Sequence, residues 1–275
     1  MPVSLPPAFS FSQSSLQDYA DCARRFQLRY LMQQEWPAPA AEPLGEVEQA
    51  DSLGRRFHRL LERHFLGLTI ERSALDPALL AWWDAFTAHP IPGLPTAVRH
   101  PEVTTTAEIG GQRMQATYDL LAYDPGGEVW IVDWKTAKRR PTQNWLDHRL
   151  QTVLYPLLLI ESARQLLGYE LKPEQVRLVY WFATAPGQSE VFTYSATRRD
   201  QDRHTIESLL QKLLSTDSSV WPLTLDTGRC HLCQYRSLCD RGKLAGRYDE
   251  GDDEETASVG FGNTDAPLPA DDYVL

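Results

Sequence analysis

Hydrophobic positions follow a helical spacing in the first part of the chain. Between residues 12 and 34 they recur every three or four positions, at Leu16, Tyr19, Ala23, Phe26 and Tyr30. This spacing predicts one amphipathic helix, with a serine cap near residue 12 and a stop at Pro37. Similar patterns predict further helices over residues 46–67 and from Pro77 to about Ala88.

The period then changes to that of strands. Val98 to Ile109 is rich in valine and threonine, and Gly110-Gly111 has the composition of a two-residue turn. Met114 to Tyr123 alternates between apolar and polar residues. After the turn-forming segment Asp124 to Gly127, a third strand is predicted over Glu128 to Thr136. These three strands should form an antiparallel meander.

The second half repeats this change. Patterns predict a helix over 144–167, strands over 176–184 and 190–194, and a helix over 197–214. The predicted order is helices, three strands, a helix, two strands and a last helix. This order indicates an α/β fold with one mixed β-sheet flanked by helices. We therefore expect one domain over residues 1–245.

Composition narrows the class of protein. With 42% hydrophobic residues the chain can bury a core, which excludes a disordered or fibrous protein. The longest apolar run, Val153 to Ile160, is too short to span a membrane, and it contains a proline. The first residues lack the charged and apolar regions of a signal peptide. We expect a cytoplasmic protein without a membrane partner.

The formal net charge of -10 is concentrated at one end of the chain. Residues 246–275 hold nine acidic residues and one arginine, so the rest of the chain is nearly neutral. The net charge therefore does not exclude a nucleic-acid partner. Because the terminal segment is acidic and poor in large apolar residues, it is expected to be a disordered acidic tail.

Candidate catalytic residues lie on the predicted meander. Asp133 and Lys135 are two apart on a strand and share one face, whereas Trp134 faces the other way. Asp119 lies on the preceding strand, near Asp133 across the pair. Two carboxylates held together need a cation between them, which predicts a Mg²⁺ or Mn²⁺ site. An exposed Asp133–Lys135 ion pair and a solvated Asp119 are the alternatives.

Other polar residues could join this site. His58 lies on the second predicted helix, and Gln151 and Tyr155 share a face of the helix after Lys135. The loop after Lys135 carries three basic side chains suited to phosphates, Lys138, Arg139 and Arg140. The alternative for His58 is a satisfied core or surface residue. For Gln151 and Tyr155 it is an ordinary helix surface, and for the basic residues it is a solvated loop.

The four cysteines are Cys22, Cys230, Cys233 and Cys239. Two disulfides are not expected in a reducing cytosol, and the Cys-x2-Cys-x5-Cys spacing indicates a metal or iron–sulfur site. Zinc suits four thiolates, although the x5 spacing departs from the usual finger pattern.

Together these motifs resemble a known family. The chain contains, in order, Gly54-x3-His58, Asp119, Asp133-Trp-Lys135 and Gln151-x3-Tyr155, preceded by Phe11-Ser12-x2-Ser15-x3-Tyr19-x2-Cys22-x3-Phe26. This order resembles the PD-(D/E)XK nuclease superfamily, and within it the RecB/AddB-type branch, over about residues 9–242. The resemblance implies a restriction-endonuclease-like core with an N-terminal helical region.

The resemblance also implies roles for individual residues. His58, Asp119, Asp133 and the Trp134 carbonyl would bind Mg²⁺ or Mn²⁺, and Lys135 would position and activate the water. Gln151 and Tyr155 would hold the scissile strand. The four cysteines would hold a structural [4Fe–4S] cluster, with zinc as the alternative.

The expected function is therefore that of a metal-dependent DNA nuclease, acting on single-stranded DNA or DNA ends in repair or recombination. The chain contains no Gly-x4-Gly-Lys-Ser/Thr motif, so any unwinding would require a separate helicase. One alternative is a non-catalytic DNA-binding scaffold subunit of a helicase–nuclease complex. Another is a trimming nuclease of CRISPR adaptation.

Overall fold

The structure is a computed structural model of the 275-residue chain. It describes all residues except 1–4, 7, 35–43, 217–220, 232 and 243–275. The expected acidic tail over 246–275 and the predicted stop at Pro37 lie outside the described residues.

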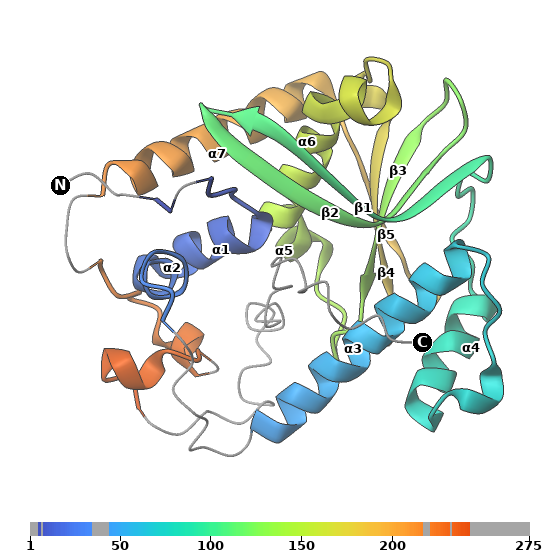
Figure 1. The fold of residues 1–275 in the computed structure, drawn as a ribbon, viewed down its shortest axis with the longest axis horizontal. Coiled ribbons are helices and arrows are strands. Elements are labelled where there is room, and N and C mark those ends of the chain that lie inside the picture. The colour runs from blue at the N-terminus through green and yellow to red at the C-terminus, as the bar shows by residue number, and fades with distance from the viewer. Residues whose placement is uncertain (1–4, 7, 35–43, 217–220, 232, 243–275) are drawn as a thin grey trace.

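A five-stranded mixed sheet forms the centre of the structure (Figure 1). Its strands are β1 (Val98–Ile109), β2 (Gln112–Tyr123), β3 (Val129–Lys135), β4 (Val176–Phe182) and β5 (Glu190–Thr193). They lie side by side in chain order. Only the β3–β4 pair is parallel, and the other three pairs are antiparallel. The prediction of an α/β fold with one mixed sheet is confirmed.

Helices cover both faces of this sheet (Figure 1). The helices are α1 (Gln13–Asp21), α2 (Ala23–Phe26), α3 (Leu44–Phe65), α4 (Pro77–Ala88), α5 (Gln143–Asp147), α6 (Leu150–Leu167) and α7 (Ala196–Leu214). Single turns are η1 (Gln27–Leu31), which is a π-helix, and the 3-10 turns η2 (Arg72–Ala74), η3 (Pro173–Gln175), η4 (Thr227–Cys230) and η5 (Arg236–Cys239). Helices α1, α6 and α7 lie on one side of the sheet, and α3 and α4 lie on the other.

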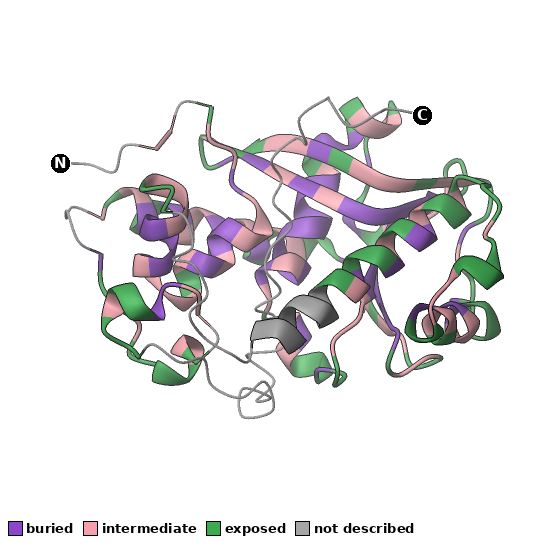
Figure 2. Ribbon diagram, turned by 60° about the horizontal axis from the view of Figure 1, so that its bottom comes forward, coloured by how far each residue is buried: buried purple, intermediate pink, exposed green. Residues whose placement is uncertain are grey.

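Two apolar cores result from this arrangement, one on each face. Side chains of β3 alternate between them: Ile131 packs in the core under α6, whereas Val132 and Trp134 pack in the core under α3 and α4. Strand β3 is buried on both faces, as expected for a central strand with a parallel neighbour. Exposed residues mark the outer faces of the helices and many of the loops (Figure 2).

Two predicted helices are broken in the structure. The helix expected over 12–34 starts with a capping box between Ser12 and Ser15, but it stops at Cys22, whose backbone is extended (φ -161°, ψ 108°). The helix expected over 144–167 is split at Arg149, which is also extended. There the N–H of Leu150 donates to the side chain of Gln17. Both breaks allow contacts with distant segments, which local periodicity does not encode.

The segment after α7 returns to the N-terminal helices. The ring of Trp221 stacks on that of Phe26, with centroids 5.6 Å apart. The N–H of Arg24 donates to the carbonyl of Pro222 (3.1 Å), and that of Trp221 donates to the Gln27 side chain (3.1 Å).

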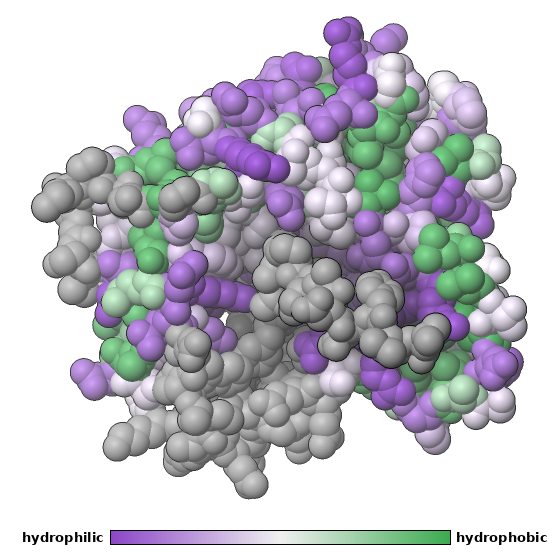
Figure 3. All heavy atoms as spheres, in the orientation of Figure 1, coloured by the Kyte–Doolittle hydropathy of each residue, from purple (hydrophilic) through white to green (hydrophobic). Residues whose placement is uncertain are grey.

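Hydrophilic residues cover the outer side of α7 (Figure 3). Among the described residues no helix is long and apolar enough to cross a membrane.

Candidate functional site

The backbone pairing of β2 and β3 ends at a pair of acidic residues, and the space beyond it is the opening between the two strands. Leu120 pairs with Val132, so the next residues facing each other are Asp119 and Asp133. Instead of continuing the backbone ladder, the N–H of Trp134 donates to Oδ2 of Asp119 (2.8 Å). Both carboxylates are buried, with 8% and 5% of the residue exposed. The expected proximity of these two acids is therefore present.

Lys135 and Gln151 hold the carboxylate of Asp133. Nζ of Lys135 lies 2.8 Å from Oδ2 of Asp133 and donates to Oε1 of Gln151 (2.7 Å). Nε2 of Gln151 donates to Oδ1 of Asp133 (2.5 Å). The lysine also lies over the ring of Tyr180, 5.0 Å from its centroid. These contacts fix the Lys135 ammonium beside the opening between the strands.

The two aspartates differ in acidity. Burial raises the pKa of Asp133 above its usual value, although the ammonium of Lys135 acts in the opposite direction. Burial acts in the same way on Asp119, but the charge of His58 and the hydrogen bond from Trp134 lower its pKa below the usual value. The pair is thus asymmetric, and Asp119 is the carboxyl group more readily ionised.

His58 approaches this opening from α3. Its Nδ1 lies 3.3 Å from Oδ1 of Asp119, and its Nε2 lies 2.9 Å from the carbonyl oxygen of Trp134. Burial lowers the pKa of His58, but Asp119 outweighs this effect and raises it to about 9. Gly54, one turn earlier, permits the approach, because a Cβ there would lie 2.8 Å from Oγ1 of Thr136. The Gly54-x3-His58 spacing therefore has a packing reason.

Glu102 is a member of this group that the sequence motifs did not indicate. One side-chain atom each from His58, Glu102 and Asp119 lie within 4.8 Å of one another. In the β1–β2 register Glu102 stands opposite Asp119, and its φ of +51° is unusual for a residue other than glycine. Burial and the charge of Asp119 raise its pKa to about 7.

The remaining predicted site residues are Tyr155 and the basic loop after β3. Tyr155 is buried, and its side chain is hydrogen-bonded to Gln151. In the predicted basic loop Lys138 and Arg139 are exposed. Arg140 forms an ion pair with Glu190 of β5, so part of the charge of this loop is engaged within the protein.

Arg149, at the break between α5 and α6, is a second residue that the sequence motifs did not indicate. Its guanidinium lies over the ring of Trp145, 4.6 Å from the centroid. Burial lowers the pKa of Arg149, and in the part of the chain that the structure describes no acidic residue forms an ion pair with it. Arg149 is therefore a cation available to an anion near the N-terminus of α6.

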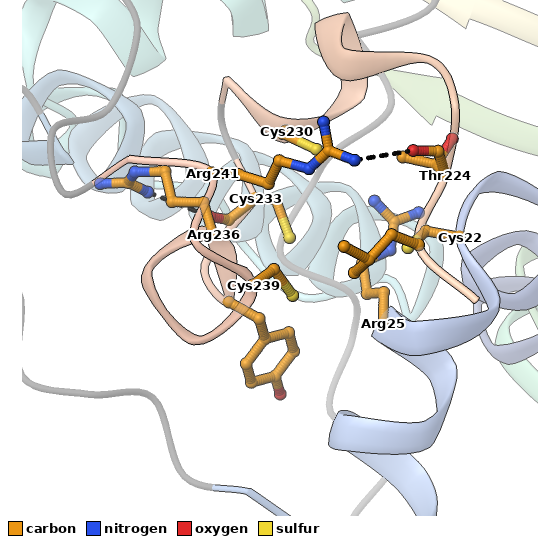
Figure 4. A pocket seen from close by; sticks show the side chains of 10 residues that line it. Cys22, Arg25, Thr224, Cys230, Cys233, Arg236, Cys239 and Arg241 are labelled. Carbon is orange, nitrogen blue, oxygen red and sulfur yellow. Dashed lines mark hydrogen bonds between the residues drawn. The ribbon is translucent and has the colours of Figure 1, made fainter. Parts of the chain in front are cut away.

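The four cysteines line one pocket, although they come from distant parts of the chain (Figure 4). Cys22 lies at the break between α1 and α2, and the other three lie in and between η4 and η5. All four are free thiols, and burial raises the pKa of Cys233 to about 11. Within the described residues no three of these sulfurs lie within 4.8 Å of one another.

Comparison with known proteins identifies the family. The chain belongs to the PD-(D/E)XK nuclease superfamily, whose family model matches residues 10–240. No curated protein is significantly similar to it. The superfamily expected from the motifs is confirmed.

Two solved structures show a distant similarity. One is of a candidate exonuclease from Eubacterium rectale, with 12% identity and a TM-score of 0.47, covering 74% of this chain and 80% of that protein. The other is of SSO0001, with 15% identity and a TM-score of 0.46, covering 86% of this chain and 88% of that protein. The family membership rests on the sequence match alone.

Proposed function

We propose that this chain is a metal-dependent deoxyribonuclease of the RecB/AddB-type branch, with one nuclease domain over residues 1–245. The observation that carries the proposal is the arrangement of Asp119, Asp133 and Lys135. Two buried carboxylates face each other where β2 and β3 part, with an ammonium 2.8 Å from one of them. A scaffold without catalytic activity has no need of such an arrangement.

The donors in this opening suit a divalent cation. Nuclease members of the superfamily use such metals. His58, Asp119, Asp133 and the carbonyl of Trp134 would hold the ion, and one imidazole among oxygen donors accepts Mn²⁺ as well as Mg²⁺. Oδ2 of Asp133 is buried and accepts no hydrogen bond of good geometry, although Lys135 is close. When bound, the ion would supply Lewis-acid charge at the scissile phosphate.

The protein side chains would position the water and the substrate. Lys135 would donate a hydrogen bond to the attacking water and stabilise the negative charge that develops on it during in-line attack. Gln151 would hold the side chains of Lys135 and Asp133 in place through its two hydrogen bonds, and Tyr155 would support Gln151. Gln151 and Tyr155 would also border the scissile strand.

We infer that the substrate is single-stranded DNA or a DNA end. Lys138 and Arg139 are exposed in the loop after β3, and Arg149 lies at the start of α6. Cations in these places suit contacts with the phosphates of a bound strand. Repair or recombination would use such an activity together with a separate helicase. Trimming of DNA before CRISPR adaptation would require the same chemistry with another partner.

We propose that the four cysteines hold a structural [4Fe–4S] cluster. All four thiols line one pocket, and Cys22 comes from the other end of the chain, so a cluster would join the two ends of the fold. The five residues between Cys233 and Cys239 depart from the usual zinc-finger spacing, and zinc is the alternative.

The test is a cleavage assay with the anaerobically purified protein. Labelled single-stranded DNA, double-stranded DNA and RNA of the same sequence are incubated with Mg²⁺, Mn²⁺ or a chelator. We expect cleavage of single-stranded DNA that requires a metal and is lost in Asp133→Asn. Asp200→Asn, an exposed change on α7, is the control. An Asp133→Asn protein that cleaves at the wild-type rate would refute the assignment.

A further inference from the structure

Glu102 adds a third acidic side chain to the two aspartates of this site. One side-chain atom each of Glu102, His58 and Asp119 lies within 4.8 Å of the others. Lys135 compensates Asp133 directly. Among the described residues no lysine or arginine forms an ion pair with Glu102. Glu102 is therefore a carboxylate beside Asp119 and His58 that no lysine or arginine of the described residues neutralises.

The backbone holds Glu102 at this place. The β1–β2 ladder is regular on both sides of it, with Pro101 paired to Leu120 and Val103 paired to Tyr118. Between these pairs Glu102 adopts a positive φ, a conformation that side chains other than glycine adopt only at a cost. The result is a carboxylate beside Asp119 and His58, within the 4.8 Å spread of one ligand set.

The neighbouring Asp133 is in a different situation. Its Oδ2 lies 2.8 Å from the ammonium of Lys135, so this carboxylate already has a cationic partner. Glu102 instead belongs with His58 and Asp119, which together offer three ligand atoms within 4.8 Å of one another.

We propose that Glu102 is a metal ligand of this centre, an inference that rests on the nuclease function proposed above. Its carboxylate binds the cation on the side formed by His58 and Asp119. Mg²⁺ and Mn²⁺ favour oxygen donors and six ligands, so a further carboxylate fits the coordination that the four donors named above leave incomplete.

Metal binding without turnover provides the test. Mn²⁺ is titrated into the metal-free wild-type protein and into Glu102→Gln, and binding is followed by calorimetry. Glu108→Gln is the matched control, since Glu108 is an exposed glutamate on the same strand. We expect the Kd for Mn²⁺ to rise about tenfold or more in Glu102→Gln and to stay unchanged in Glu108→Gln.

Thermal unfolding of the metal-free protein distinguishes between a metal-ligand role and a structural role for Glu102. Because Glu102→Gln removes repulsion from Asp119, we expect its metal-free form to melt at or above the wild-type temperature and to gain less from added Mn²⁺. Equal Kd values in Glu102→Gln and the wild type would overturn this inference and leave the nuclease function standing. A lower melting temperature without metal would make Glu102 structural and also overturn it. A wild-type protein that binds no Mn²⁺ would remove the proposed function itself.

Discussion

The side chain of Asp119 replaces a backbone carbonyl as the acceptor for the N–H of Trp134. This hydrogen bond ties a carboxylate on β2 directly to the strand that carries Asp133. The distance between the two acids is therefore set by the sheet and not by flexible side chains. It also means that Asp119 has a structural task that can be separated from its charge.

The first prediction separates these two tasks. Asp119→Asn and Asp119→Ala both remove the charge, but only asparagine keeps an acceptor for the buried N–H of Trp134. We expect both variants to lose cleavage, and Asp119→Ala to be less stable than Asp119→Asn by about 1–3 kcal/mol. Urea unfolding of the two metal-free variants measures this difference. Equal stabilities would mean that another group satisfies the N–H.

The second prediction concerns the close approach of α3 at Gly54. A methyl group there meets Oγ1 of Thr136 and displaces the turn that carries His58. We expect Gly54→Ala to lower the cleavage rate by about 10–100-fold, because small displacements of a ligand are costly to catalysis. Adding Thr136→Ala to Gly54→Ala should restore most of the rate, and Thr136→Ala alone should have little effect. Failure of this rescue in rate measurements would refute the packing explanation.

The third prediction concerns pH and the proton on His58. Asp119 holds the pKa of His58 at about 9 in the folded protein, above the usual 6.5. The folded form therefore binds the proton more tightly, and this contribution to stability is complete below pH 6.5 and lost as pH rises through 9. Urea unfolding of the metal-free protein between these pH values should show the decline. Asp119→Asn should flatten it, whereas an unchanged slope would contradict the pairing.

The fourth prediction assigns a phosphate contact to Arg149. We expect Arg149→Ala to weaken binding of single-stranded DNA and to reduce the slope of log K against log salt by about 0.7, the change for one phosphate contact. Arg164→Ala is the control, because Arg164 lies on the same helix and is paired with Glu170. Fluorescence titrations in Ca²⁺ at several salt concentrations would measure both variants. Identical slopes for Arg149→Ala and the wild type would exclude the contact.

The fifth prediction concerns the cysteine pocket. Anaerobically purified protein should be brown and contain about four irons per chain. Cys22→Ser should lose iron and thermal stability as fully as Cys233→Ser, because both sulfurs line one pocket. Metal analysis and melting curves provide the measurement. Stoichiometric zinc without iron in the wild-type protein would contradict the iron–sulfur cluster and indicate a zinc site.

The sequence was most informative where short-range pattern determines structure. Alternation and turn residues predicted the strands. Separations of four residues predicted which side chains share a helix face. The breaks at Cys22 and Arg149 were missed because they depend on partners far away in the chain, such as the Gln17 side chain at the second break. Periodicity holds no information about such contacts.

The same distinction applies to the site. The acids on adjacent strands could be paired from the sequence, because the turn between β2 and β3 sets their register. Glu102 could not be identified, since a glutamate after a proline in a strand rich in threonine has no pattern of its own. Its significance depends on a left-handed backbone angle and on the approach of α3. Both are properties of the folded chain.

The stacking of Trp221 on Phe26 has a consequence for the order in which a newly made chain can fold. Synthesis runs from the N-terminus, so α1 and α2 are made before any strand of the sheet. Their ring partner Trp221 and the carbonyl of Pro222 follow only after all five strands. The helices that are synthesised first therefore cannot complete their packing until Trp221 and Pro222 have been synthesised. Their final packing is a late event of biogenesis, and a chain interrupted before Trp221 lacks the contacts to complete it.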